Sequence, residues 1–493
     1  MKAHRLGADS QRAQGPRASA LLAATLAAFA VTPVAAQTVT PGQSYASTQS
    51  GSTATLNPSD LSQNADDTTA TGDLALRQTQ DVALTPEEQD ALDLEAMRRQ
   101  NLPQKSVDYE DRLQPKGTRP ELDGIRLGTV VLRPSLSERL LSETTKTGGS
   151  KEHALYSSTT LKGSLTSDWS RHELSVTGAG TWQKLLSGSG DADPSADVNA
   201  NLRLDLAAGT TVTLSSGYSF TREDAEDQDA IANAKTQYGI HRFDGGITAA
   251  HAVGRLRGSV GLDGSRWLYS DAVLNNGTDL SLEDRQRTLG TLRGRLGYEI
   301  SPALIPFIEV SGGRLVYDQK TDSTGYQRSA YIYAAKTGAE FDFGEKLRGE
   351  LAVGYIHETF DDARLNDING LTLDGTINWS PRDGTDIKYG LSTSLDPATT
   401  AGTGGAVVYS ANAEIAQQLR DNLVATLTGT TTWNRYPDAS SSNSTSYAAD
   451  AELAYEFNRY LALTAGLGYE YTQRKTSADT EVLRASVGLT AKR

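Results

Sequence analysis

Charged residues alternate with apolar residues along many stretches of this sequence. In residues 449–457, for example, Asp450, Glu452 and Glu456 stand between apolar neighbours. A β-strand directs successive side chains to opposite faces, so this spacing gathers the charges on one face and the apolar groups on the other. Such a charged face can attract and select ions, whereas catalysis needs a nucleophile beside a base. The two histidines that we expect within strands, His241 and His357, have no catalytic motif around them, and no enzyme is predicted.

The same alternation assigns the two faces of the other stretches. Arg203 and Asp205 alternate with leucines, and so do Arg293 and Arg295. A charge facing hydrocarbon near the bilayer midplane costs ~2–4 kcal/mol, so we expect the apolar face to meet lipid and the charged face to line a water-filled lumen. The candidate lumen-lining residues are Arg203, Asp205, Arg255, Arg257, Arg293, Arg295, Lys336, Glu340, Asp342, Arg348, Glu350, Asp374, Lys388, Asp450, Glu452 and Glu456.

These candidates also suggest how charge is distributed around the lumen. The arginines come largely from the N-terminal stretches, whereas Asp374, Asp450, Glu452 and Glu456 come from the C-terminal ones. The pattern predicts opposed basic and acidic walls, whose transverse field would favour dipolar or zwitterionic solutes.

Composition supports a barrel with a wet interior. Of the 493 residues only 37% are hydrophobic, and the chain has 46 glycines and 20 tyrosines. A barrel of this kind needs only one apolar face per strand, whereas a soluble β-sandwich needs a dry core and has shorter strands. The chain has no cysteine, which excludes disulfides and cysteine metal sites, and we expect no metal and no cofactor. A net charge of -14 argues against a nucleic-acid partner.

The N-terminal part differs in character from the rest. Lys2, Arg5, Arg12 and Arg17 precede a short apolar core, and small residues at Val34 and Ala36 suit cleavage, which predicts a signal peptide over residues 1–36. Residues 37–123 are Ser/Thr-rich at first and predict a disordered periplasmic extension. The extension carries a helix near 86–100, either an exposed linker or a contact element or plug.

From Gly124 to residue 493 the chain reads as strands joined alternately by short and long connections. Eight short turns are centred on "DWSRHE", "LAAGTT", "HAVGRL", "EISPAL", "DFGEKL", "SPRDGTD", "LRDNL" and "FNRYL". Together with the flanking strands they predict an all-β, up-and-down antiparallel transmembrane barrel of about 18 strands. Aromatic residues near the strand ends are predicted to form girdles at the two membrane interfaces. They include Trp169, Trp182, Phe343, Tyr355, Trp379, Phe457 and Tyr460, and also Tyr218, Tyr269, Tyr317 and Trp433.

The hairpin around Asn458 gives the sharpest register prediction. A three-residue turn that includes Tyr460 pairs Phe457 with Leu461 and places the leucines of both strands on the lipid face. The same register sets Glu452 opposite Gly466 and Asp450 opposite Gly468, which leaves space for the carboxylates.

Three segments resemble one known family. "GIRLGTVVLRPSLS" (124–137), the stretch from "EFDFGEKLRGELAVGY" to "NWSPRDGT" (340–385) and "LAYEFNRYLALTAGLGYEY" resemble the putative β-barrel porin 2 family of Gram-negative bacteria. The resemblance covers about the last three quarters of the chain. It departs from the family at "SERLLSETTK" and at the end, "VLRASVGLTAKR", which lacks a terminal aromatic residue although Leu483, Val487 and Leu489 still form an outward row.

The resemblance implies an integral outer-membrane barrel. With the charged lumen, it predicts a passive channel for small polar or ionic solutes. The alternative is an outer-membrane component of exopolysaccharide export, or a structural barrel that stays closed until partnered. The expected partners are the outer-membrane bilayer with its lipopolysaccharide, the barrel-assembly machinery and, for the alternative, periplasmic export components.

Overall fold

The computed structural model describes residues 124–493 except 191, 208, 224–229, 232–233, 398–400, 438–442 and 476–477. The predicted signal peptide (1–36), the periplasmic extension (37–123) and its helix near 86–100 lie outside the described residues. Within the described part of the chain, no helix is long and apolar enough to cross a membrane.

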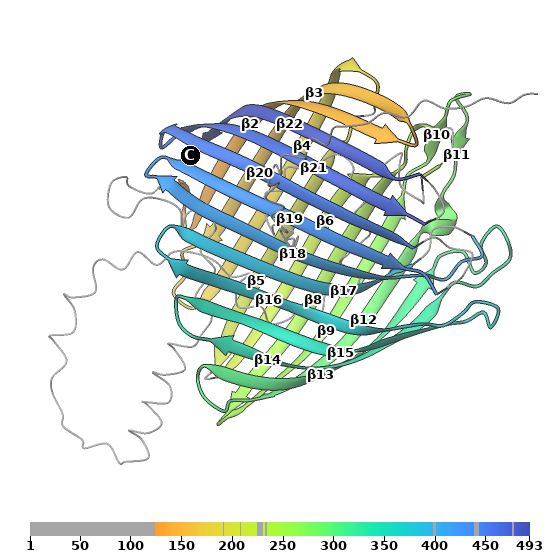
Figure 1. Ribbon diagram of the computed structural model, residues 1–493. Coiled ribbons are helices and arrows are strands. Elements are labelled where there is room, and N and C mark those ends of the chain that lie inside the picture. Colours follow the sequence, from red (N-terminus) through yellow and green to blue (C-terminus); the bar gives the residue numbers. More distant parts are fainter. Residues whose placement is uncertain are drawn as a thin grey trace, which may run out of the picture.

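Eighteen long antiparallel strands form a closed barrel, which confirms the predicted fold class and strand number (Figure 1). The first and last of them close it, with pairs running from Ser135 opposite Lys492 to Thr147 opposite Thr480. The barrel strands are β2 (Val130–Thr147), β3 (Ser150–Ser167), β4 (His172–Gly188), β5 (Ser195–Ala207), β6 (Thr210–Arg222), β8 (Gly239–Val253), β9 (Leu256–Tyr269), β12 (Arg287–Tyr298), β13 (Leu304–Tyr317), β14 (Ala330–Asp342), β15 (Leu347–Phe360), β16 (Ile368–Arg382), β17 (Thr385–Pro397), β18 (Gly405–Arg420), β19 (Leu423–Arg435), β20 (Ser444–Asn458), β21 (Leu461–Arg474) and β22 (Thr480–Lys492).

All eight predicted short turns join strands at one end of the barrel, the end where β22 finishes. A short strand, β1 (Ile125–Leu127), pairs with the start of β2 at this same end. We call it the periplasmic end and the opposite end, which carries the longer connections, the external end. The alternation has one exception, because β2 and β3 meet externally in a tight turn at Gly148 and Gly149. Their φ angles of 57° and 94° favour glycine.

The outer face of the barrel is largely apolar, with polar side chains such as Glu138 in β2 among the apolar ones. Leu161, Val260 and Leu371 are 60%, 59% and 67% exposed, and each alternates with an inward neighbour. In the C-terminal strand Leu483, Val487 and Leu489 form the expected outward row. An exposed apolar belt of this extent belongs in lipid.

The hairpin of β20 and β21 has the predicted register. Glu452 stands opposite Gly466 and Asp450 opposite Gly468. The final pair differs, because a bulge at the end of β20 places Asn458 opposite Leu461 instead of Phe457. Asn458 Oδ1 accepts hydrogen bonds from the backbone N–H groups of Tyr460 and Leu461, at 2.8 and 3.1 Å, and this Asx-type turn absorbs the extra residue.

The predicted aromatic girdles are partly correct. Trp169, Trp182, Phe343, Trp379 and Phe457 are exposed on the outer face. Tyr269 and Tyr317 are buried instead, at 7% and 5% exposure. Tyr269 and Tyr317 have the inward parity of their strands, whereas Leu262 and Val310 on the same strands have the outward parity. Position near a strand end therefore does not determine which face an aromatic side chain occupies.

The external connections carry structure of their own. A small sheet of β7 (Ala234–Thr236), β10 (Ala272–Leu274) and β11 (Asp279–Leu280) and a short 3-10 helix, η2 (Glu283–Arg285), lie at the external end (Figure 1). Tyr238, Ala272 and Leu282 from these connections pack against inward-facing Trp267 and Leu315. This apolar cluster therefore lies inside the barrel near the external end.

The external half of the β17–β18 hairpin folds inside the barrel wall. The ladder between β16 and β17 begins at Gly375–Leu391 and continues toward the periplasmic end, with a register shift between Trp379 and Arg382. Beyond it, Leu395 and Val407, which have the outward parity of their strands, pack against inward-facing Ile368 of β16. β18 also contacts β16 directly. The wall thus overlaps itself here, because the hairpin passes behind β14–β16 on the lumen side.

The side-chain hydroxyl of Thr393 takes the place of a backbone partner where the ladder between β16 and β17 is missing. Its Oγ1 accepts a hydrogen bond from Leu373 N at 2.9 Å and donates to Leu373 O at 3.2 Å. We expect Thr393→Val, which is nearly isosteric, to lower the free energy of unfolding by ~1–3 kcal/mol, because both backbone groups lose their partner. Urea unfolding in lipid vesicles measures the loss. Thr337→Val, in a strand paired with both neighbours along its length, should cost clearly less; an equal cost for the two variants would contradict the role of Thr393.

Candidate functional site

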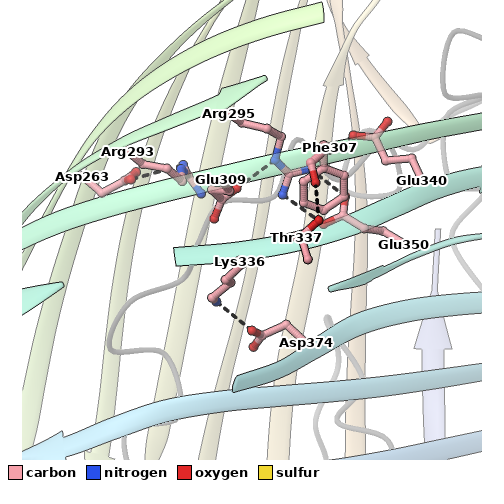
Figure 2. Close-up of polar contacts among 10 residues, drawn as sticks. All are labelled: Asp263, Arg293, Arg295, Phe307, Glu309, Lys336, Thr337, Glu340, Glu350 and Asp374. Atoms are coloured by element: carbon pink, nitrogen blue, oxygen red, sulfur yellow. Dashed lines mark hydrogen bonds and ion pairs between the residues drawn. The ribbon is translucent and has the colours of Figure 1, made fainter. Parts of the chain in front are cut away.

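Most of the predicted lumen-lining charges stand on the inward face of the strands, and many of them form ion pairs there. Arg295 of β12 lies at the centre of the largest group (Figure 2). Its Nε donates to Glu309 Oε2 at 2.8 Å, and its two terminal nitrogens bind both oxygens of Glu350 at 2.8 and 3.0 Å. Nη1 also reaches Glu340 Oε1 at 3.2 Å. One cation therefore holds three carboxylates from three neighbouring strands.

The stacking of Arg295 on Phe307 completes this group. The guanidinium carbon lies 3.9 Å from the centre of the Phe307 ring. A planar guanidinium can bind a carboxylate in a fork and stack on a ring at the same time, which an ammonium group cannot do. Glu309 and Glu350 are 3% and 5% exposed, so these charges are largely removed from water.

Ion pairs between strands and within strands neutralise several other candidates. Arg257 pairs with Glu299 at 2.9 Å and Arg293 with Asp263 at 3.3 Å. Lys336 pairs with Asp374 at 2.7 Å (Figure 2). Three further pairs join Arg203 to Asp205, Arg242 to Asp244 and Lys388 to Glu414.

Two of the predicted C-terminal carboxylates have cationic partners as well. Glu452 pairs with Arg139 at 2.9 Å and Glu456 with Lys492 at 2.6 Å. Arg484 bridges Glu143 and Glu470 at 2.9 and 3.0 Å. The prediction of opposed basic and acidic walls is therefore wrong, because each part of the wall carries paired charges of both signs. The pairing partners were missed because register between distant strands decides which charges meet.

Three candidates stand at the periplasmic rim. Arg255 is exposed in the turn between β8 and β9, and so does not lie on the inward face of a strand. Asp342 ends β14 and accepts a hydrogen bond from Gly344 N at 2.9 Å. Arg348 stands beside it, in register with Asp342 on the next strand. Histidines also occur in more strands than predicted, since His153, His172 and His251 lie in β3, β4 and β8.

A buried arginine near the external end was also missed. Arg287 is 1% exposed, and its guanidinium lies 5.1 Å from the Trp267 ring centre and 5.5 Å from that of Tyr269. Arg328 stacks on Tyr317 at 4.6 Å. The signal for Arg287 was present in the alternation of β9, β12 and β13, which places Trp267, Tyr269, Arg287 and Tyr317 on the inward face.

Two external connections are tied together by Asp322. Its carboxylate accepts hydrogen bonds from Thr324 N, Tyr326 N and Gly402 N at 2.9, 3.0 and 2.8 Å. Burial raises the pKa of Asp322, but the hydrogen bonds from Tyr326, Gly402 and Thr324 outweigh it and hold the pKa below its ordinary value. The carboxylate form therefore joins the 318–329 connection to the inward-folded hairpin.

The hydrogen bonds of Asp322 to the two connections, which we call the Asp322 clasp, should break in acid. A lowered folded-state pKa means that the stabilisation is complete above the ordinary value, ~3.9, and is lost as pH falls through the lowered value. At neutral pH we expect Asp322→Ala to speed amide hydrogen exchange at Gly402 and Tyr326 by roughly tenfold or more, since it removes an ionised acceptor. Asp361→Ala is the control, because Asp361 pairs with Arg314 on the outer rim and should leave Gly402 unchanged. Unchanged exchange in Asp322→Ala would contradict the clasp.

The fold and this wall define a class of protein: a transmembrane β-barrel with an apolar outer face and an ion-paired polar lumen. A family model described as putative beta-barrel porin 2 matches residues 119–493. The chain belongs to this family, which confirms the resemblance seen in the sequence. It is thus a porin-like outer-membrane protein that sits in the lipid bilayer.

Solved outer-membrane proteins are similar to this chain at low sequence identity and low TM-score. OpdK of Pseudomonas aeruginosa is 13% identical, with a TM-score of 0.36 over 73% of this chain and 99% of that one. OccAB4 of Acinetobacter baumannii is 10% identical, with a TM-score of 0.36 over 73% and 98%. OccK2 of Pseudomonas aeruginosa is 10% identical, with a TM-score of 0.37 over 73% and 98%. A search of curated proteins found no match.

Proposed function

We propose that the protein is a passive channel through which small polar or ionic solutes cross the outer membrane without chemical change. The observation that carries this proposal is the inner wall, where charged residues from neighbouring strands pair in a barrel of 18 strands. Barrels of about this size enclose an aqueous path when their inward face is polar. Alternating paired charges offer successive weak contacts to an ion, which favours passage over tight binding.

The inward-folded hairpin would set the width of the path at the external end. Lipopolysaccharide would surround the external rim, and the barrel-assembly machinery would insert the barrel. The alternative role in exopolysaccharide export, with periplasmic export components as partners, is not favoured by any contact in the described residues or by the family match.

Single-channel recording in planar bilayers tests the proposal. The full chain should give discrete conductance steps that grow with salt concentration. A variant lacking residues 37–120 serves as the second sample. It distinguishes a barrel that is blocked by these residues from a barrel that has no aqueous path at all. Absence of conductance in both samples, with both barrels correctly folded, would overturn the channel function.

A further inference from the structure

A cavity lies where the barrel wall overlaps itself. Strands β9 and β12–β15 form one side of it, and the inward-folded part of β17 forms the other, through residues such as Leu395 and Pro397. The cavity exists because the hairpin leaves the wall and passes over the inward face of its neighbours. It borders the ion-paired wall, because Asp263, Arg293 and Lys336 belong to both.

Most of the cavity surface is apolar, which is unusual for the inward face of this barrel. The larger apolar side chains are Trp267, Leu289, Leu315, Ile332, Ile356 and Leu395. An apolar concave surface with a few polar groups is typical of a binding site for a small organic molecule. It disfavours strongly hydrated solutes such as sugars, because most of the surface cannot replace the hydrogen bonds that their hydroxyl groups make to water.

Two buried hydrogen-bond donors at the cavity have no acceptor. Arg293 is 4% exposed; its Nη2 reaches Asp263 at 3.3 Å, but its Nη1 has no hydrogen-bond partner. Trp267 is 1% exposed, and its Nε1 also has no partner. A buried donor without an acceptor costs free energy, so both groups favour a bound molecule that supplies one.

The other charged groups at the cavity are already engaged. Lys336 is held by Asp374 at 2.7 Å, and Asp263 is held by Arg293. The unsatisfied groups are both donors, and one of them is a cation, so the favoured ligand atom is an anionic oxygen.

We propose that this cavity binds a small amphipathic carboxylate, with its carboxylate on Arg293 and its aliphatic body against the apolar wall. This inference rests on the proposed channel function, because it names a class of solute that the channel would carry. Such a solute would leave the polar path for the cavity during passage through the external half of the barrel.

Isothermal titration calorimetry of the full chain in a non-ionic detergent tests the binding. The probes are hexanoate, hexan-1-ol and hexylammonium, which share chain length and differ in charge, with acetate as the probe that lacks the apolar body. We expect saturable binding of one hexanoate per chain, at least tenfold tighter than that of the other three. Equal affinity for hexanol and hexanoate would overturn the carboxylate assignment, and absence of hexanoate binding would overturn the site.

Three variants separate the contributions. Arg293→Gln should weaken hexanoate binding by roughly tenfold to a hundredfold, because it removes the charged donor. Asp263→Asn, which removes the competing carboxylate, should retain or tighten it. Ala334→Leu, which fills the cavity from β14, should abolish binding of hexanoate and hexanol alike. Unchanged affinity in Arg293→Gln would overturn the proposal, and heat-modifiable migration on gels confirms that each variant is folded.

The two proposals can fail separately. Calorimetry does not depend on an open path, so a barrel that binds hexanoate without conducting would overturn the channel and leave the site in place. A conducting barrel that does not bind hexanoate would overturn only the site.

Discussion

Replacing Arg295 by alanine should destabilise the barrel by ~3–5 kcal/mol, the largest effect that we expect from a single substitution in the lumen. The guanidinium holds Glu309, Glu340 and Glu350 together, and two of these carboxylates are almost fully buried. Without the cation, their charges repel one another in a place from which water is largely excluded. Guanidinium-induced unfolding in lipid vesicles, followed by tryptophan fluorescence, measures the free energy of unfolding.

Two further variants show whether charge or packing is responsible. Arg203→Ala removes an arginine whose ion pair with Asp205 is more exposed, so it should cost only about 0–1 kcal/mol. The triple variant Arg295→Met, Glu309→Gln, Glu350→Gln keeps the volume and removes the buried charges, so it should recover most of the lost stability. An Arg295→Ala barrel as stable as the Arg203→Ala barrel would show that water reaches these carboxylates freely.

Period-two alternation was sufficient to predict the architecture. It predicts the strands, the face of each residue and the approximate strand number, because one buried or lipid-facing side fixes the register against slips of one residue. The β20–β21 hairpin shows this well: Asp450 and Glu452 stand opposite Gly468 and Gly466 as predicted. Only the bulge beside Asn458 was missed, since a side-chain hydrogen bond to the turn decides it.

The pairing of charges and the folding of the β17–β18 hairpin could not be read in the same way. Arg139 and Glu452 are far apart in sequence and meet only because the barrel closes. Leu395 and Val407 have the outward parity that predicts contact with lipid, yet they pack on Ile368 inside the wall. Parity gives the face of a residue relative to its own sheet. It does not tell whether that sheet stays in the wall, which depends on interactions such as that of Thr393 with Leu373.

Replacing Leu292 by arginine should cost ~2–4 kcal/mol of unfolding free energy, the cost of a charge on the lipid side near the bilayer midplane. Leu292 is 57% exposed on the outer face and lies in the middle of β12, whereas its neighbour Arg293 points into the lumen. An arginine at position 292 would therefore face lipid, whereas the arginine at position 293 faces the lumen. Unfolding in vesicles, with Leu292→Ala to account for the lost apolar area, measures the cost of the charge itself.

The depth of the substitution provides the matched control. Leu256 is 49% exposed on the same outer face but is the first residue of β9, beside the periplasmic turn. An arginine there can extend to the membrane surface, so Leu256→Arg should cost only about 0–1 kcal/mol. A large cost at 292 with a small one at 256 requires that the outer face meets hydrocarbon in the middle and water near the turns. Equal costs would mean that this face is not in lipid. Contact with hydrocarbon would then not explain why the charged residues face inward and the apolar residues outward.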